Sequence, residues 1–368
     1  PLRRGCFFSS LQVIGMRPLW GAVLTTCLAV EATSEINSRH CLQSAFPDSR
    51  SELPVLLNCL GLVREAVEVG VQAGVHAHNF LEKWKGDRLR LVDLWGEEGS
   101  DTNLFYVDIA NVHGVAARRQ HRIQCEERLE RSLRSGHAEV LHLESAIAAS
   151  QIPDGHLDFV YLDARHDFAG VVADIHAWWP KVRVGGVFAG HDFVDGEFPE
   201  GDFFWISALE EALPRLDVHV IRERNRYPSF FILKSQEMSS LMPRKVDTTA
   251  LTLKLYADRS KYFDLWAQKL KGSGAPEVGD RFLSSCKDTC SSDCSQRVSN
   301  FTPSRTAVST LRPFACGQGQ ETCASEVTLD VDVYRQVCLE RCNVTCQQRL
   351  ELFQKHGEQI MSYRPKEW

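Results

Sequence analysis

The 368-residue chain has the composition of a folded globular protein, which excludes the disordered and fibrous classes. Hydrophobic residues make up 43% of the sequence, enough to bury a core, and the length suits about two domains. The formal net charge of -6 argues against a broadly basic surface of the kind that binds nucleic acid. We therefore expect a small or glycan-like ligand and no nucleic acid.

The N-terminal residues have the pattern of a secretory signal. Arg17 precedes an apolar run over 19–30, and small residues follow near Ala32. The run is about a dozen residues long, whereas a membrane-spanning helix needs roughly 20, so no stable membrane span is expected. We predict a cleaved signal peptide within residues 1–34. The alternatives are a mitochondrial presequence or a plain apolar helix.

From residue 65 onward, short apolar runs alternate with helical ones. Strands are predicted at 65–70, 88–93, 138–143, 157–163 and 185–190, helices at 74–85, 102–134, 168–179 and 203–213, and an antiparallel pair at 218–221 and 229–233. This alternation predicts a doubly wound, Rossmann-like α/β sheet with helices on both faces. Ligands of such sheets bind outside the carboxyl ends of the strands, so functional residues should lie there.

The last part of the chain is predicted to be a small α-helical, cysteine-rich module over 276–368. It follows one amphipathic helix over 249–270 and a Gly-Ser-Gly-Ala-Pro linker over 272–276. Eight cysteines lie after residue 285, namely Cys286, Cys290, Cys294, Cys316, Cys323, Cys338, Cys342 and Cys346. On helices, each four-residue repeat of cysteine lies along one face, so disulfides can join two antiparallel helices.

The cysteines also indicate the compartment. A dense, even set of cysteines is typical of disulfides in an oxidising environment, and two glycosylation sequons begin at Asn300 and Asn343. With the N-terminal pattern, they predict a secreted glycoprotein or one in the lumen of the secretory pathway, the alternative being the mitochondrial intermembrane space. Zinc binding is the weaker interpretation of the cysteines, because the tail has no histidine before His356.

The turn after the first strand has the parts needed to bind a nucleotide-like ligand. Glu68 precedes Gly70 and Gly74, whose lack of a side chain lets a ligand approach the backbone, and a helix follows. Asp93 ends the second strand, where a carboxylate can accept hydrogen bonds from both ribose hydroxyls. The alternative for Asp93 is that it only caps the next element.

A second segment carries the resemblance to a known family. Residues 156–168 read HLDFVYLDARHDF, then Trp178-Trp179-Pro180 follows, and 185–193 read GGVFAGHDF. This order of motifs closely resembles the class I S-adenosylmethionine-dependent methyltransferases with the pattern "DFVYIDADHSY…GG…AGHDY". The resemblance covers 53–234, about half of the chain. Gln72 and Arg165 depart from the family pattern.

The resemblance implies S-adenosylmethionine as cofactor and a set of site residues. The methionine part of the cofactor would contact Glu68, Gly70 and Gly74, its ribose Asp93, and its adenine Leu94 and Ser145, with Asp163 facing the reacting methyl group. Methyl transfer requires alignment of a nucleophile and removal of its proton, for which His166 or His191 is the candidate base.

The set of Asp163, His191 and Asp192 is also similar to the acidic metal sites of some O-methyltransferases that act on sugars and small molecules. A divalent ion such as Mg²⁺ held there would lower the pKa of an acceptor hydroxyl. The alternative is that both carboxylates cap loops and the histidines bond to backbone, since histidine is an unusual ligand for Mg²⁺.

These features predict a methyltransferase that acts on an oxygen of a small molecule or glycan. Two other functions stay open. An NAD-dependent oxidoreductase uses the same strand and ribose logic, although the turn lacks G-x-G-x-x-G. A non-catalytic protein would keep the fold and use the cysteine-rich tail to bind a protein partner.

Overall fold

The computed structural model describes residues 38–96, 107, 115–223, 227–270, 275–300 and 331–363. The chain divides into two compact units, 1–46 and 47–368. In the first unit, 38–44 are helical. The expected signal peptide, Cys316 and Cys323 lie outside the described residues. Among the described helices, none is long and apolar enough to cross a membrane.

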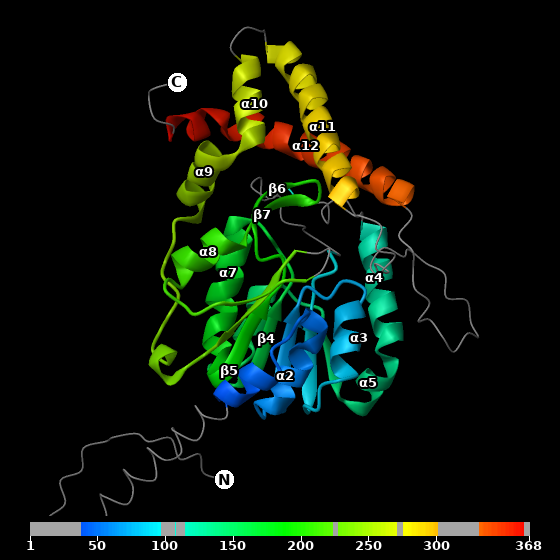
Figure 1. The fold of residues 1–368 in the computed structure, drawn as a ribbon, viewed down its shortest axis with the longest axis vertical. Coiled ribbons are helices and arrows are strands. Elements are labelled where there is room, and N and C mark those ends of the chain that lie inside the picture. Colours follow the sequence, from blue (N-terminus) through cyan, green and yellow to red (C-terminus); the bar gives the residue numbers. More distant parts are fainter. Residues whose placement is uncertain are drawn as a thin grey trace, which may run out of the picture. The chain divides into compact units, whose positions relative to one another are not determined.

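A seven-stranded sheet forms the centre of the second unit (Figure 1). Its strands are β1 (Glu65–Val69), β2 (Arg88–Val92), β3 (Ala138–Leu141), β4 (Leu157–Leu162), β5 (Val182–Gly190), β8 (His219–Ile221) and β9 (Ser229–Leu233). The strand order is β3-β2-β1-β4-β5-β9-β8, in which β1 to β5 are parallel and β9 is antiparallel to both of its neighbours. The predicted Rossmann-like sheet is thus confirmed, and its strand order reverses between β1 and β4.

Two groups of helices cover the two faces of this sheet (Figure 1). One group comprises η1 (Arg50–Glu52), α2 (Leu53–Cys59), α3 (Val75–Leu81), α4 (Val115–Arg128) and α5 (Glu130–Ser135), and the other α6 (Ser145–Ser150), α7 (Phe168–Trp178), η3 (Trp179–Lys181) and α8 (Trp205–Ala212). β4 is buried along its whole length, as expected for a parallel strand covered on both faces. The helix α7 begins where the Asp167 carboxylate accepts the Gly170 amide.

Two of the predicted helices have different bounds in the structure. The predicted helix 102–134 is broken at Leu129 into α4 and α5, and its residues 102–106 and 108–114 lie outside the described ones. The predicted helix 203–213 begins only at Trp205. Phe203 and Phe204 belong instead to a hairpin of β6 (Asp195–Phe198) and β7 (Gly201–Phe204), which the sequence analysis did not predict.

The predicted helix 249–270 is also two helices, α9 (Thr248–Arg259) and α10 (Lys261–Leu270). Ser260 separates them because its backbone is extended and its hydroxyl accepts the amide of Phe263, as an N-cap does. The next helix, α11 (Ala275–Asn300), starts inside the predicted linker with Pro276 in its first turn, where the missing N–H of proline costs nothing. A last helix, α12 (Val331–Ser362), completes this region.

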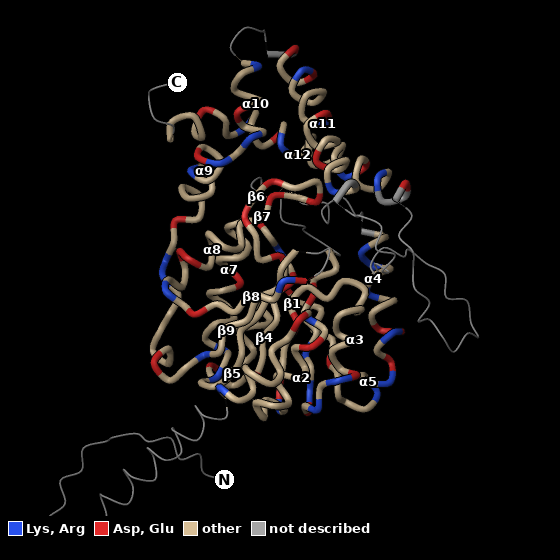
Figure 2. Tube along the Cα trace, viewed as in Figure 1, with Lys and Arg blue, Asp and Glu red and all other residues tan. Residues whose placement is uncertain are grey.

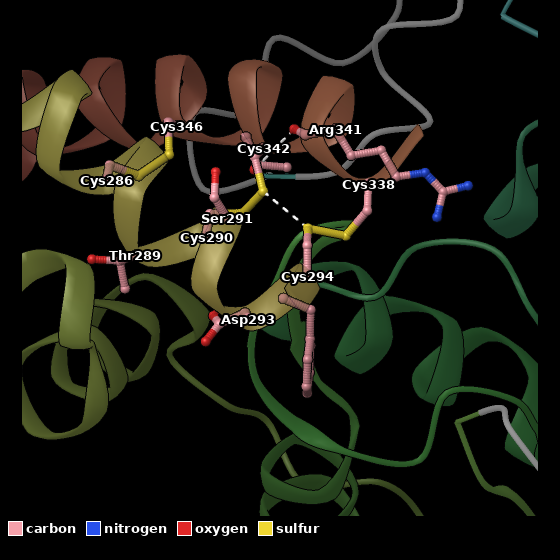
Figure 3. Close-up of a disulfide and its surroundings, with 12 residues drawn as sticks. Cys286, Thr289, Cys290, Ser291, Asp293, Cys294, Cys338, Arg341, Cys342 and Cys346 are labelled. Carbon is pink, nitrogen blue, oxygen red and sulfur yellow. Dashed lines mark hydrogen bonds between the residues drawn. A yellow bond between two sulfur atoms is a disulfide. The ribbon is translucent and has the colours of Figure 1, made fainter. Parts of the chain in front are cut away.

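Three disulfides join α11 to α12, as predicted from the cysteine spacing. They pair Cys286 with Cys346, Cys290 with Cys342, and Cys294 with Cys338, so the two helices run antiparallel (Figure 3). These six sulfurs are therefore not available as zinc ligands. Cys41 and Cys59 are each disulfide-bonded as well, and the described free thiol, that of Cys125, is buried.

The hairpin packs against the junction between α9 and α10. The carboxyl group of Glu197 in β6 accepts the amide of Lys261 at 3.0 Å and the hydroxyl of Ser260. Burial, together with the nearby Asp202 carboxylate, raises the pKa of Glu197 to about 7 from an ordinary 4.5, although the Arg349 guanidinium opposes this rise. Glu197 therefore loses its proton near neutral pH in the folded protein.

The raised pKa of Glu197 predicts a fall in stability between pH 4.5 and 7 that Glu197→Gln should remove. The protonated carboxyl is favoured in the folded state, so its contribution is complete below pH 4.5 and is lost as the pH rises through 7. The loss should be at most about 3 kcal/mol. Urea unfolding of both proteins from pH 4.5 to 8 measures it. Parallel stability profiles for the two proteins would contradict this assignment.

Candidate functional site

The predicted site residues of β1, β4 and β5 meet where the strand order of the sheet reverses. Because parallel strands end at the same edge, the segments that follow them converge there. Glu68 and Gly70 come from β1 and its turn, Asp163 and His166 follow β4, and His191 and Asp192 follow β5. The structure places Asp163, His191 and Asp192 with their ligand atoms within 4.8 Å of one another.

The turn after β1 requires glycine at two positions. Gly70 has a φ of +86°, and a Cβ there would lie 2.1 Å from the backbone oxygen of Asp163. Gly74 has a φ of +71°, and a Cβ there would lie 2.9 Å from the sulfur of Cys125. Both positions combine a left-handed backbone with close neighbours, so other residues would displace the turn. The β1 turn is thereby held directly against the end of β4.

Glu68 is a buried carboxylate beside this turn. Its residue is 2% exposed, and its Oε2 lies 3.3 Å from His76 Nδ1 without hydrogen-bond geometry. Among the described residues, Oε2 has no hydrogen-bond donor. The His76 ring is stacked on Tyr161 of β4, with 4.4 Å between centroids. A buried carboxylate oxygen that lacks a donor suits a ligand carrying a positive charge or an N–H group.

Asp93 holds the β1 turn in the structure. Its Oδ2 accepts the amides of Val71 at 2.9 Å and Gln72 at 2.8 Å, and its Oδ1 accepts the amide of Trp95 at 2.8 Å. This agrees with the alternative in which Asp93 caps backbone groups. The role of Asp93 toward a ribose stays a prediction. Gln72, which departs from the family pattern, adopts a φ of +51° in this turn.

The two residues predicted to flank an adenine differ in accessibility. Leu94 is 40% exposed, and its carbonyl oxygen lies 2.8 Å from Nε2 of His142 at the end of β3. The hydroxyl of Ser145 instead donates to Asp174 at 2.5 Å and accepts from Trp178 at 2.9 Å. The Ser145 hydroxyl thus supports the contact between α6 and α7, and His142 is a neighbour of Leu94 that the sequence analysis did not select.

Two histidines and two aspartates lie in contact at the ends of β4 and β5, and we call them the His–Asp array: Asp163, His166, His191 and Asp192. Asp192 lies between the histidines, with Oδ1 2.8 Å from His191 Nδ1 and Oδ2 2.9 Å from His166 Nε2. Asp163 Oδ1 is 3.8 Å from each of the same two nitrogens. The Nε2 of His191 is buried and has no hydrogen-bond partner among the described residues.

The histidines of this array and the nearby Arg50 keep both aspartates ionised. Burial opposes ionisation, yet the nearby His191, His166 and Arg50 hold the pKa of Asp163 below its ordinary value. Burial likewise opposes ionisation of Asp192, but the two histidines hold its pKa far below the ordinary range. Asp192 also has a φ of +55°, an uncommon backbone conformation that directs its side chain into the array.

Three more side chains lie at the site. Arg50 of η1 donates to Asp163 Oδ2 at 3.1 Å, from a position just before the predicted domain. Tyr161 lies two residues before Asp163, and strand alternation could have placed it on the same side of the sheet. Phe203 packs its ring on His166, with 4.6 Å between centroids. Arg50 has no local sequence signal that points to the site, whereas the aromatic run that contains Phe203 is such a signal.

Comparison with known families agrees with this geometry. Residues 67–193, which contain the strands β1 to β5 and the His–Asp array, match a family model described as "Methyltransferase domain". This segment is therefore similar to methyltransferase domains. A search among curated proteins gave no match for the chain.

Solved structures show distant likenesses to the chain. An O-methyltransferase from Bacillus cereus in complex with S-adenosylhomocysteine (SAH) is 18% identical, with 58% of this chain and 91% of that chain covered and a TM-score of 0.35. A methyltransferase from Geobacter sulfurreducens is 14% identical, with 60% of this chain and 100% of that chain covered and a TM-score of 0.34. A spermidine synthase from Thermotoga maritima is 11% identical, with 47% of this chain covered and a TM-score of 0.32, and the match spans 54% of the synthase.

Proposed function

We propose that this protein is an S-adenosylmethionine-dependent methyltransferase that methylates a hydroxyl group of a small molecule or glycan. The observation that carries the proposal is the His191–Asp192 pair at the end of β5, within the methyltransferase domain and beside the glycine turn of β1. Such a pair is suited to removing a proton from a hydroxyl group.

The residues around the β1 turn fit the cofactor. When bound, S-adenosylmethionine supplies a methyl group that its positively charged sulfur activates for transfer. Oε2 of Glu68, which has no donor among the described residues, would accept a hydrogen bond from the ammonium group of the methionine part of the cofactor. Gly70 would let the turn lie against the end of β4, and Asp93 would hold the turn in the shape that receives the cofactor. Contacts of Asp93 with the ribose and of Leu94 with the adenine belong to the same proposal.

His191 is the base in this mechanism. Asp192 is ionised and 2.8 Å from Nδ1, so the His191 proton resides on Nδ1 and the lone pair on the buried Nε2. That lone pair would accept the proton of the acceptor hydroxyl, so that the oxygen could react with the methyl group that the cofactor would supply. Asp192 stabilises the resulting imidazolium, and Asp163 with Arg50 keeps the opposite side of the array fixed.

A divalent ion such as Mg²⁺ is the alternative way to activate the hydroxyl. Asp163, His191 and Asp192 could hold it, and the ion would lower the pKa of a bound hydroxyl. A proton on Nδ1 and a metal on Nδ1 exclude each other. An unchanged rate after EDTA treatment would favour the histidine base, whereas a rate lost with EDTA and restored by Mg²⁺ would favour the metal.

The proposed location is the lumen of the secretory pathway or outside the cell. The disulfides between α11 and α12 support it, because such bonds persist in oxidising compartments. N-linked glycosylation at Asn343, which is exposed on α12, is part of the same proposal. A glycan acceptor would be accessible to the enzyme there, and the disulfide-joined helices are the surface we propose for a protein partner.

Cofactor binding is the first test of the proposed function. By isothermal titration, the wild-type protein should bind S-adenosylmethionine and SAH but not NAD. Gly70→Ala should weaken SAH binding at least ~10-fold, because its Cβ would meet Asp163 O at 2.1 Å. Gly136→Ala is the matched control, since Gly136 has a similar φ of +75° with no atom within 4 Å of a Cβ, and its SAH affinity should be unchanged.

The acceptor is identified by the transfer of a labelled methyl group from S-adenosylmethionine to a panel of phenols, sugars and oligosaccharides. Absence of SAH binding would overturn the proposed function, and tight NAD binding would replace it with an oxidoreductase. Binding of SAH without transfer to any acceptor would favour the non-catalytic alternative.

A further inference from the structure

The β6–β7 hairpin lies between the disulfide-joined helices and the His–Asp array. Acidic residues (red) mark this hairpin in Figure 2, and arginines from α11 and α12 meet them. At its tip, Glu200 is 3.0 Å from Arg297 of α11 and 3.1 Å from Arg341 of α12. The hairpin is therefore attached to both of the helices that the disulfides join.

The strongest attachment is a fully buried ion pair between α12 and β7. Arg349 donates from Nε and Nη2 to Asp202 Oδ1, at 3.1 and 2.5 Å, and both side chains are 0% exposed. The same Nη2 donates to the carbonyl oxygen of Phe198 in β6 at 2.8 Å, and Tyr256 donates to the other Asp202 oxygen at 2.9 Å. Arg349 thus fixes both strands of the hairpin by directional bonds.

The neighbouring residues of β7 contact the candidate base region. Side chains alternate along a strand, so Phe203 points away from the side on which Asp202 meets Arg349. Its ring packs on the imidazole of His166 at 4.6 Å, and the amide of Phe204 donates to the carbonyl oxygen of His166 at 2.9 Å. Three consecutive residues therefore connect Arg349 with both the ring and the backbone of His166.

The burial of the Arg349–Asp202 ion pair indicates that it fixes the position of β7 rather than adding stability. Removing two charges from water costs nearly as much as their attraction returns, so a buried pair adds little stability compared with apolar residues of the same size. It does enforce one arrangement, because any shift of β7 would leave a charge unpaired. A shift of β7 would also move the ring that packs on His166.

We propose that Arg349 is a positioning residue for His166 and acts through Asp202 and Phe203. The disulfide-joined helices are thereby part of the methyl-transfer site rather than an independent appendage. This inference rests on the proposed function only for its kinetic consequence. The connection from Arg349 to the imidazole is a structural claim that can be measured without an acceptor.

The test uses the full chain with the paired substitution Arg349→Met and Asp202→Asn, which leaves no buried charge without a partner. Proteins with ¹⁵N-labelled histidine are compared by NMR at one pH, with the His166 signals assigned from a His166→Asn variant. The paired variant should shift the imidazole signals of His166. Its kcat should fall at least ~10-fold with the KM for S-adenosylmethionine unchanged, because His166 contacts the Asp192 carboxylate that orients the base His191, and misalignment of that pair lowers the rate steeply.

Two further variants separate positioning from stability. Arg349→Lys keeps the charge but loses the forked donors that bond Asp202 and Phe198, so it should shift the His166 signals and lower kcat, although less than the paired variant does. Phe282→Leu reduces packing between the same helices, because the rings of Phe282 and Phe353 pack together with 5.8 Å between their centroids. This substitution leaves the residues of the hairpin unchanged. It should lower the melting temperature but leave kcat and the His166 signals unchanged.

Unchanged His166 signals in the paired variant would overturn the inference, as would equal effects of Phe282→Leu. Absence of SAH binding by the wild-type protein would instead overturn the proposed function, and the NMR comparison would still decide the role of Arg349.

Discussion

Asp192→Asn should bind SAH as the wild-type protein does, yet transfer methyl groups about 10²–10⁴-fold more slowly. The asparagine has the size of aspartate and tolerates the left-handed φ of +55° found at this position, so the turn should persist. An amide N–H directed at His191 Nδ1 would reverse the tautomer and place the proton on Nε2. The base would then be unable to accept a proton. The measurement is kcat at saturating S-adenosylmethionine on the best acceptor.

His166→Gln is the informative companion to this variant. His166 contacts the other oxygen of Asp192, at 2.9 Å, and its loss leaves the bond that His191 donates to Asp192 in place. We expect a smaller decrease in kcat than for Asp192→Asn. Equal activity of Asp192→Asn and wild type would contradict His191 as the base. Recovery of Asp192→Asn in excess Mg²⁺ would instead indicate that the array holds a metal.

The sheet and the His–Asp array follow directly from the sequence because both depend on strand ends. Apolar runs fix the strands, and a parallel sheet brings the residue after each strand to one edge. Asp163 and Asp192 were thus predicted to lie together, although they are far apart in sequence and no local pattern relates them. The match over 67–193 covers this same part of the chain.

The contacts made by loops could not be predicted in the same way. Arg50 reaches Asp163 across 113 positions of sequence, and no periodic pattern relates the two. Asp93 was selected by residue type, but whether its carboxylate meets backbone amides or a ribose depends on how the β1 turn folds. Phe203 was assigned to a helix, because an aromatic run before Trp205 fits a helix and a strand equally well.

For α11 and α12, the contact between the two helices could be predicted from the sequence, but their contacts with the rest of the protein could not. The four-residue spacing of cysteines predicted which faces of α11 and α12 meet, because the helical period fixes it. The contacts of these helices with β6 and β7 depend on a hairpin that was not predicted. Nothing in the sequence therefore singled out Arg349, which is 0% exposed.

Loss of the three disulfides between α11 and α12 should unfold these helices at ambient temperature. The bonds are nested, with sequence separations of 44, 52 and 60. Loop entropy assigns about 4 kcal/mol to the innermost bond and about 2 to 3 kcal/mol to each outer one, because each closes only a short further loop. Their sum approaches the whole stability of a typical domain, about 5–15 kcal/mol.

The measurement compares urea unfolding, followed by circular dichroism, of the oxidised protein and a variant with all six cysteines replaced by serine. This variant is preferred to chemical reduction, which would also break the bonds at Cys41 and Cys59. The intermediate step is Cys290→Ser with Cys342→Ser, which should cost about 2 to 3 kcal/mol.

Cysteines must be replaced in pairs for this comparison to be valid. Cys342 Sγ lies 3.5 Å from Cys294 Sγ, so a lone Cys290→Ser would leave a thiol beside a neighbouring disulfide (Figure 3). Thiol–disulfide exchange would then form a different bond and hide part of the loss. A six-serine variant that unfolds at the wild-type urea concentration would contradict the prediction. In that case packing of α11 and α12 against the hairpin, rather than their disulfides, would hold the region together.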